Sequence, residues 1–122
     1  MIVNQGDIYL VPLEESNDSE HIHPHVVIQD NVINHSRIKT VVVCALTTNA
    51  KRANVPGNVL LEAGEANLPR QSIVVVSQVS TVVKAQLGEY IGTLSQQRIN
   101  QILAGMRFLQ LMTKHHETGA EK

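Results

Sequence analysis

Aromatic residues are scarce in this chain of 122 residues, which has two tyrosines, one phenylalanine and no tryptophan. We therefore expect an aliphatic core, and a surface that stacks several nucleic-acid bases on several rings is almost excluded. Cysteine is nearly absent as well. The single Cys44 excludes an internal disulfide and a zinc site built from several thiolates. Its place in the apolar run 40–46 predicts a small side chain that fills a gap in the core.

An excess of charge of one sign is also missing. Ten basic and eleven acidic residues give a formal net charge of −1, so any affinity for a nucleic acid must come from locally placed charge. No apolar run approaches the roughly 20 residues that span a bilayer, and we see no secretory signal. With 43% hydrophobic and 17% charged residues, we expect a single folded domain that is soluble and cytoplasmic.

The apolar pattern predicts a series of short strands. They are expected at 8–11, from 26 onward, and at 39–46, 59–62, 72–76 and 79–83. Two of them are continuous β-branched runs, which are typical of strands covered on both faces. Polar segments at 14–24 and 50–57 are expected to be loops. Closely spaced short strands of this kind favour a small barrel or sandwich.

One helix is expected after the strands, from Gln96 to about Thr113, with Ser95 as its N-cap. Apolar side chains recur along one face at helical spacing, which favours core packing over a ligand groove. They are Ile99, Ile102, Leu103, Met106 and Leu109. We expect residues 1–113 to form the domain and residues 114–122 to form a flexible tail.

Three histidines alternate in the polar segment before the second strand, namely His21, His23 and His25. In an extended chain all three side chains would lie on one side, where imidazoles can bind a transition metal. The alternative is a solvated segment. No partner carboxylate or distant histidine follows at ligand spacing, so we favour that alternative and expect no metal or other cofactor.

A second polar group follows the strand at 39–46. Thr47 and Thr48 are followed by Asn49, Lys51 and Arg52, and such hydroxyls and cations can hold a phosphate oxygen. Threonine is also ordinary at a strand end. The chain has no Walker loop, GxSxG elbow or HExxH motif. Residue patterns alone therefore predict a small aliphatic β-rich domain with one helix, and no particular activity.

The order of several short motifs adds a function. They read QGDIY at 5–9, SE at 19–20, HPHVVIQD at 23–30, ALTTN at 45–49, PGNV at 56–59, SQVSTV at 77–82 and IGTL at 91–94. In this order and spacing the chain resembles the MazF/PemK family of toxin endoribonucleases, from about residue 3 to residue 109.

The resemblance implies a mainly β fold with a C-terminal helix, a small SH3-like barrel of the MazF/CcdB type that forms a homodimer. It also implies cleavage of single-stranded RNA at short sequences without a metal. In that reaction the 2′-hydroxyl attacks the neighbouring phosphate and leaves a cyclic phosphate and a 5′-hydroxyl. A cognate antitoxin would inhibit the enzyme by occupying its RNA groove, and no membrane partner is expected.

The family supplies an arginine just before a loop proline and a threonine at a strand end. Thr47 matches the threonine, whereas His23 stands in the place of the arginine. The resemblance thus assigns catalysis to His23 and Thr47, with His25 as a further acid or base. It assigns RNA binding to Ser19, Glu20, Thr48, Asn49, Lys51, Arg52, Gln78 and Ser80. Ser80 stands where many members carry a basic residue.

The missing arginine leaves two functions open. In the first, His23 performs acid–base catalysis. In the second, the site is degenerate, and the protein binds nucleic acid or an antitoxin without cutting RNA. Loss of one preorganised donor costs roughly 2.7–4 kcal/mol, but an imidazole moves protons near neutral pH, which arginine does poorly. We favour the nuclease. Gyrase poisoning, by analogy with CcdB, is a third option, which the lack of an aromatic residue at the C-terminus disfavours.

Overall fold

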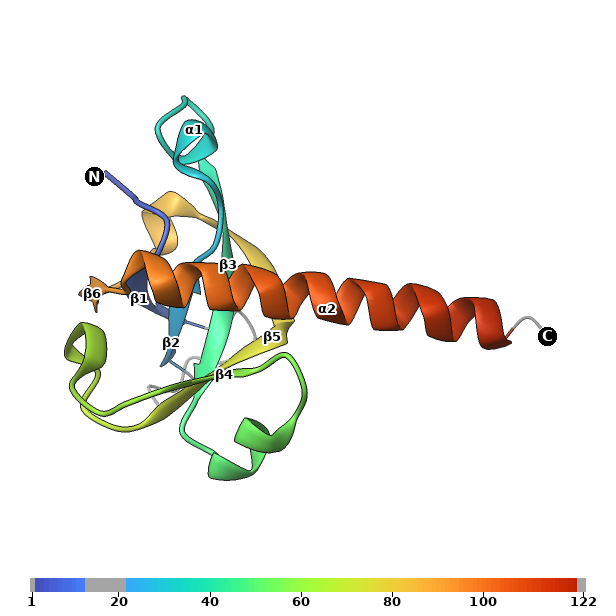
Figure 1. Ribbon diagram of the computed structural model, residues 1–122. Helices are drawn as coiled ribbons and strands as arrows, with labels where there is room; N and C mark the ends of the chain where they lie inside the picture. Colours follow the sequence, from blue (N-terminus) through green and yellow to red (C-terminus); the bar gives the residue numbers. More distant parts are fainter. Residues whose placement is uncertain (1, 13–21, 121–122) are drawn as a thin grey trace.

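The computed structural model describes residues 2–12 and 22–120, with residues 114–120 described by their backbone alone. Six antiparallel strands form one curled sheet in the order β4-β5-β3-β2-β1-β6, and a long helix crosses it and projects beyond it (Figure 1). The strands are β1 (Asp7–Pro12), β2 (Ile22–Val27), β3 (Thr40–Thr47), β4 (Val59–Leu61), β5 (Ser72–Val83) and β6 (Tyr90–Thr93). The predicted fold class, mainly β with a C-terminal helix, is confirmed.

Both faces of this sheet are covered, as the continuous β-branched runs predicted. One face, here called the α2 face, carries Ile8, Val26 and Cys44 and packs against the helix α2 (Gln96–Ala120). The opposite face, here called the Tyr9 face, surrounds a smaller second core. That core contains Val3, Tyr9, Val11, Val27, Val41, Val43 and Leu87. Apart from Tyr9 and Cys44, the buried side chains of the two cores are aliphatic.

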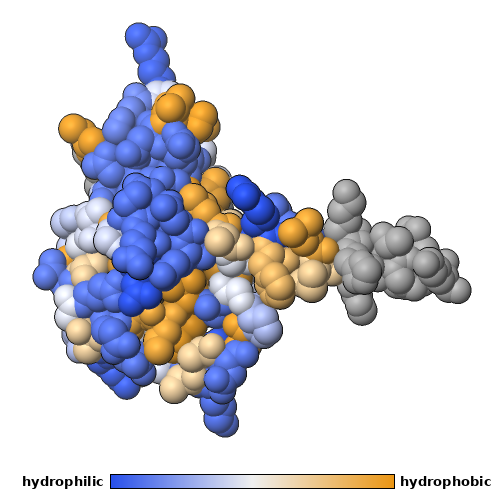
Figure 2. Space-filling view, viewed as in Figure 1, coloured by the Kyte–Doolittle hydropathy of each residue, from blue (hydrophilic) through white to orange (hydrophobic). Residues whose placement is uncertain are grey.

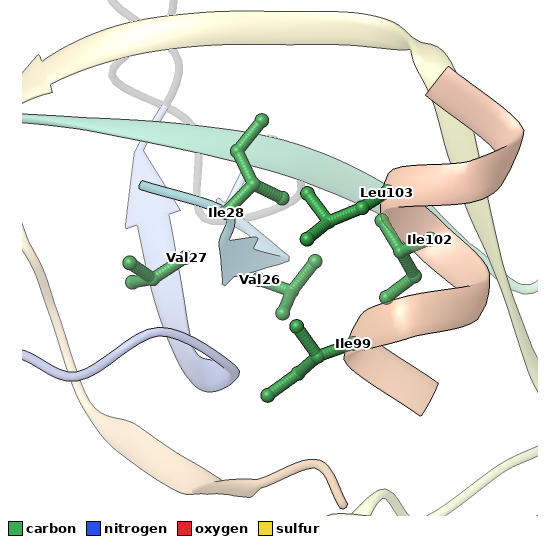
Figure 3. Close-up of a pocket in the computed structure, with 6 residues that line it drawn as sticks. All are labelled: Val26, Val27, Ile28, Ile99, Ile102 and Leu103. Atoms are coloured by element: carbon green, nitrogen blue, oxygen red, sulfur yellow. The ribbon is translucent and has the colours of Figure 1, made fainter. Parts of the chain in front are cut away.

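Interdigitated aliphatic side chains attach α2 to the sheet. In Figure 3 the side chains of Val26 and Ile28, which belong to the sheet side of the contact, point toward Ile99, Ile102 and Leu103 of the helix. Together with Val27, these side chains leave no space large enough for a water molecule. Further along α2, a side chain on Gly105 would collide with the carbonyl oxygen of Gly57, so the helix needs glycine there to approach the loop. The predicted core packing of the helix stripe is confirmed, although Leu103 stays partly exposed.

The pairing of β3 with β5 contains a large irregularity. Cys44 pairs with Val79, but Leu46, two residues on, pairs with Val74. The thiol of Cys44 occupies this break and donates to the carbonyl oxygen of Val75, with 3.0 Å between sulfur and oxygen. Burial raises the pKa of this thiol to about 12. The predicted role of Cys44 as a core filler is confirmed, while the prediction of two strands at 72–76 and 79–83 is wrong, because β5 continues through the irregularity.

Several other boundaries differ from the sequence patterns. The predicted loop at 14–24 ends early, because β2 begins at Ile22, where pairing with Pro12 extends the strand into a polar segment. Residues 13–21 lie outside the description. Ser95 caps α2 as predicted, its hydroxyl oxygen accepting from the Arg98 N–H at 3.2 Å. The helix continues to Ala120, however, past its predicted end at about Thr113. None of the helices described is long and apolar enough to cross a membrane.

The sequence patterns also missed the shortest elements. Helix α1 (Asn31–Asn34) is capped by Asp30, whose carboxylate accepts from the Val32 N–H at 2.8 Å. Three 3₁₀ turns, η2 (Ala50–Asn54), η3 (Glu65–Asn67) and η4 (Lys84–Gln86), lie in the connections. The predicted loop at 50–57 thus contains η2. Strand β6 holds Gly92, where a side chain would collide with the carbonyl group of Ala66, so η3 packs closely on that strand.

The contact between α2 and the sheet predicts a difference in stability between two positions on the same helix. We expect Ile102→Ala to lower the free energy of unfolding by about 2–5 kcal/mol, because it opens a cavity in a filled core. The exposed neighbour substitution Gln97→Ala should change it by less than about 0.5 kcal/mol. Urea unfolding followed by circular dichroism measures both. Equal effects would contradict the account of how α2 is attached.

Candidate functional site

Strand β2 carries two of the three alternating histidines onto the Tyr9 face. His25 pairs with Tyr9 on β1 and with Ala45 on β3, and His23 pairs with Val11. Because residues two apart share a face, both imidazoles lie on the side of the sheet that carries Tyr9 and Val11. Their exposure differs, however. His23 is exposed, whereas only 4% of His25 is accessible.

Thr47 ends the neighbouring strand at the same end of the sheet. The register that pairs His25 with Ala45, continued for two residues in each antiparallel strand, sets Thr47 opposite His23. Thr47 is half-buried and lies on the Tyr9 face, because it alternates with Val43 of the second core. The recorded pairing of β2 with β3 ends at His25 and Ala45, so His23 and Thr47 lie just beyond it, at the same end of the two strands. The two residues assigned to catalysis therefore share one edge and one face.

A tight turn leads from Thr47 to the two cations. The hydroxyl oxygen of Thr47 accepts from the Asn49 N–H at 3.2 Å, and the Asn49 side-chain oxygen accepts from the Lys51 N–H at 3.1 Å. Thr48, Asn49 and Lys51 are exposed, and Arg52 is half-buried in η2. Since the Thr47 oxygen already accepts one bond, its own O–H is available to donate. The turn places a hydroxyl, exposed backbone and positive charge next to each other.

The remaining residues assigned to RNA lie farther away or outside the description. Ser80 pairs with Val43, so it lies on the Tyr9 face, about 13 Å along the sheet from Thr47. Gln78 is exposed in the irregular part of β5. Ser19, Glu20 and His21 belong to the segment 13–21, which the structure does not describe. The structure thus groups His23, His25 and Thr47, with Thr48, Asn49, Lys51 and Arg52 beside them.

The surroundings of His25 fix its protonation. Its Nδ1 lies 2.8 Å from the carbonyl oxygen of His23, and a carbonyl can only accept, so Nδ1 carries the proton and Nε2 has a lone pair. Burial lowers the pKa of His25, an effect that the bond to the His23 carbonyl partly opposes and the nearby His23 side chain reinforces. His25 is therefore neutral at pH 7. It can accept a proton, and it adds no positive charge for holding a phosphate.

The metal interpretation of the histidines concerns a larger set than the structure describes. Within residues 2–12 and 22–113, where side chains are described, no group of three or more His, Cys, Asp or Glu residues could hold a metal ion. His21, the third member of the alternating trio, lies outside those ranges. Of the other two, His23 is exposed and His25 is buried.

Sequence reasoning missed one feature of this face. Tyr9 and Tyr90 stand beside each other on β1 and β6, with ring centroids 5.6 Å apart and ring planes at 60°. Tyr9 also pairs with His25 across β1 and β2. The signal was present as two isolated tyrosines, but only the strand pairing, which joins residues far apart in the sequence, places them in one row with the histidine.

Known proteins are similar to this chain in sequence. Residues 4–109 match the family model described as PemK-like, MazF-like toxin of type II toxin-antitoxin system. Endoribonuclease MazF6 of Mycobacterium tuberculosis is 32% identical over 109 residues, which is 88% of this chain and 96% of that protein. Endoribonuclease MazF of Staphylococcus saprophyticus is 30% identical over 103 residues, which is 83% of this chain and 85% of that protein.

Solved structures share the fold. A mycobacterial endoribonuclease in complex with its cognate antitoxin matches with a TM-score of 0.70 and 22% identity, over 85% of this chain and 90% of that one. The MazE-MazF structure from Deinococcus radiodurans matches with a TM-score of 0.69 and 13% identity, over 90% of this chain and 96% of that one. The curled sheet with its C-terminal helix is therefore the fold of MazF toxins.

The buried, neutral His25 predicts a dependence of stability on pH. Its pKa is lower in the folded chain than the value of about 6.5 in the unfolded chain, so the unfolded chain binds more protons between the two values. The free energy of unfolding should therefore fall as the pH drops from 7 through 6.5 toward the folded pKa. Urea midpoints at pH 7.5 and 5.5 measure this fall. It should be smaller in His25→Gln. An equal fall in the wild type and in this variant would contradict the assignment.

Proposed function

The chain belongs to the PemK-like, MazF-like toxin family of type II toxin–antitoxin systems and is an endoribonuclease, and we propose that it cuts single-stranded RNA at short sequences with its own side chains and no metal. The observation that carries this proposal is the shared edge and face of His23 and Thr47. Two strands bring an imidazole and a hydroxyl together beside a turn that carries two cations. Transfer of a phosphate between oxygens of RNA requires groups of these kinds.

The reaction is an attack of the 2′-hydroxyl on the adjacent phosphorus. The bond from O2′ to phosphorus forms, the bond to O5′ breaks, and the products are a cyclic phosphate and a 5′-hydroxyl end. A base must take the 2′ proton and an acid must protonate the leaving 5′-oxygen. His25 suits the base, because burial keeps it neutral with its lone pair on Nε2. We assign the acid to His23, whose exposed imidazole lies on the same face of the sheet.

The phosphate needs donors and positive charge while its oxygens gain charge. We assign this to the Thr47 hydroxyl and the exposed backbone of Thr48, with Lys51 and Arg52 as the local cations that a chain of net charge −1 requires. Asn49 shapes the turn through its two hydrogen bonds. Gln78 and Ser80 extend the RNA surface along β5, and Ser19 and Glu20 keep the same assignment from the sequence.

We also propose two protein partners. Two of the structural relatives are complexes of a toxin with its antitoxin, which supports a cognate antitoxin for this chain. A second copy of the chain is the other partner. Where α2 leaves the sheet it carries exposed apolar side chains, visible in Figure 2. Their exposure to water is unfavourable in a lone chain and is typical of an interaction surface. They include Phe108, Leu111 and Met112. A membrane partner is not proposed.

A second candidate function rests on one specific observation. Residues 13–23 contain no arginine, and His23 stands where the family pattern has that side chain. An imidazole has fewer donors than a guanidinium and carries no permanent charge. In this alternative the site has lost cleavage, and the protein binds nucleic acid or its antitoxin only.

Substitutions at the shared edge separate these functions. In buffer with EDTA, His23→Ala and Thr47→Ala should each lower the cleavage rate of single-stranded RNA by about 100-fold or more, the usual contribution of an acid–base group or an oxyanion donor. His35→Ala is the matched control, since His35 is exposed and bonds to Asn4 instead. Gel analysis of a labelled RNA measures the rates. Cleavage by the wild type that requires an added metal ion would contradict the mechanism, and antitoxin binding without any cleavage would establish the alternative.

The proposed base predicts the pH profile of the reaction. Because the pKa of His25 is lowered, kcat/KM should rise with pH through a value below 6.5 as the imidazole loses its proton. In His25→Gln the residual activity should lose that acidic limb. Rates from pH 4.5 to 8, with circular dichroism to confirm folding, measure the profile. If the profile of His25→Gln keeps an acidic limb at the same pH as the wild type, another group is the base.

A further inference from the structure

Tyr90 is an exposed aromatic side chain in a chain that has few aromatic residues. Its exposed fraction is 52%, whereas that of its neighbour Tyr9 is 5%. We propose that Tyr90 forms a nucleobase-binding subsite, in which one base of the RNA strand stacks on its ring. This inference rests on the proposed function, because that function supplies the RNA as ligand. It adds a binding residue that neither the sequence motifs nor the residues around His23 include.

The place of Tyr90 in the sheet supports this role. Tyr90 pairs with Tyr9, and Tyr9 pairs with His25, so the three side chains form one row across β6, β1 and β2 on the Tyr9 face. Neighbouring strands are about 4.8 Å apart, which puts the backbone of Tyr90 about 10 Å from that of His25. His25 and Tyr9 are buried, so the exposed groups here are Tyr90 and His23, which are two strands and two residues apart, or about 12 Å by the same spacings. A strand of RNA bound at His23 therefore has a neighbouring nucleotide within reach of Tyr90.

The ring of Tyr90 is also held in a fixed position. Its edge-to-face contact with Tyr9 has a centroid distance of 5.6 Å. Its hydroxyl lies 2.6 Å from the hydroxyl oxygen of Thr93, which in turn donates to the buried carboxylate of Asp7 at 2.7 Å. The polar end of the side chain is thus engaged within the protein, and what remains accessible is mainly ring surface. A rigid ring loses little conformational entropy when it binds a ligand.

A nucleobase is the ligand class that fits such a surface. Every base has a π-face, so stacking on one aromatic ring adds affinity with little preference for base identity. The hydroxyl of Tyr90 is occupied, so readout of a base edge by hydrogen bonds is not expected from this residue. The other exposed ring, Phe108, lies on α2, which packs against the opposite face of the sheet.

Binding of a single strand that cannot be cut tests the subsite. The probe is a 2′-deoxy oligonucleotide of the cleaved sequence with a fluorescent label, measured by anisotropy in EDTA. Tyr90→Leu should raise Kd by about 10- to 100-fold, the range expected when one base loses its stacking partner. Tyr90→Phe should change Kd by less than about threefold. Thermal unfolding of each variant checks that its fold is kept.

A second arm identifies the base. Single abasic positions are moved along the probe, and at one of them the wild type should bind as weakly as Tyr90→Leu binds the intact strand. The emission of tyrosine, observable because the chain has no tryptophan, should fall on binding to the intact strand. It should fall less with that abasic strand.

The outcomes separate this inference from the function on which it rests. Equal Kd values for the wild type and Tyr90→Leu, or a loss in Tyr90→Leu that no abasic position reproduces, would overturn the stacking subsite and leave the nuclease intact. Normal stacking without any RNA cleavage would overturn the nuclease and leave the subsite. A wild-type protein that binds no single strand at micromolar concentration would overturn both.

Discussion

The antiparallel register between β2 and β3 is the constraint on which the site depends. It pairs His25 with Ala45 and so brings the start of one strand and the end of the other to a single edge. A shift of one residue would turn His23 and His25 to the α2 face, where aliphatic side chains fill the space. The register is protected because both faces of the sheet are buried. Val26 and Cys44 belong to one core, and Val27 and Val43 belong to the other.

Pro24 keeps the start of β2 unpaired on the side that faces Thr47. A proline has no N–H to donate to a neighbouring strand, and the pairing of β2 with β3 runs only from His25 to Val27. On its other side β2 stays paired with β1 as far as Ile22. The strand is therefore held in place while its side toward Thr47 has no backbone pairing. His23 thus sits on a supported backbone with an exposed side chain. A rigid strand positions a functional group better than a free loop does.

Most of the fold could be predicted from the sequence, because it depends on local patterns. The apolar runs located β1, β3 and β4 to within a residue or two, and the spacing of Ile99 and Ile102 identified the face of α2 that packs. The errors came from long-range pairing. Strand β5 continues past its irregularity because it pairs with β3 on both sides of the break. Strand β2 extends into polar residues because β1 pairs with it there. The four residues of β6 have no pattern of their own, since Gly92 and Thr93 are strand residues only by virtue of Asp7 and Ile8.

The candidate site shows the same division between local and long-range information. The family motifs alone were enough to select His23 and Thr47, because each sits in a short recognisable string. The different environments of His23 and His25 could not be predicted, since alternation makes the two residues equivalent until a second core closes over one of them. That closure changes the chemistry available. A guanidinium has one protonation state near neutral pH, whereas in the proposed reaction the buried, neutral imidazole of His25 is the base and His23 is the acid. Under that proposal, the histidine that removes a permanent charge from this edge also supplies a proton transfer that the charge could not perform.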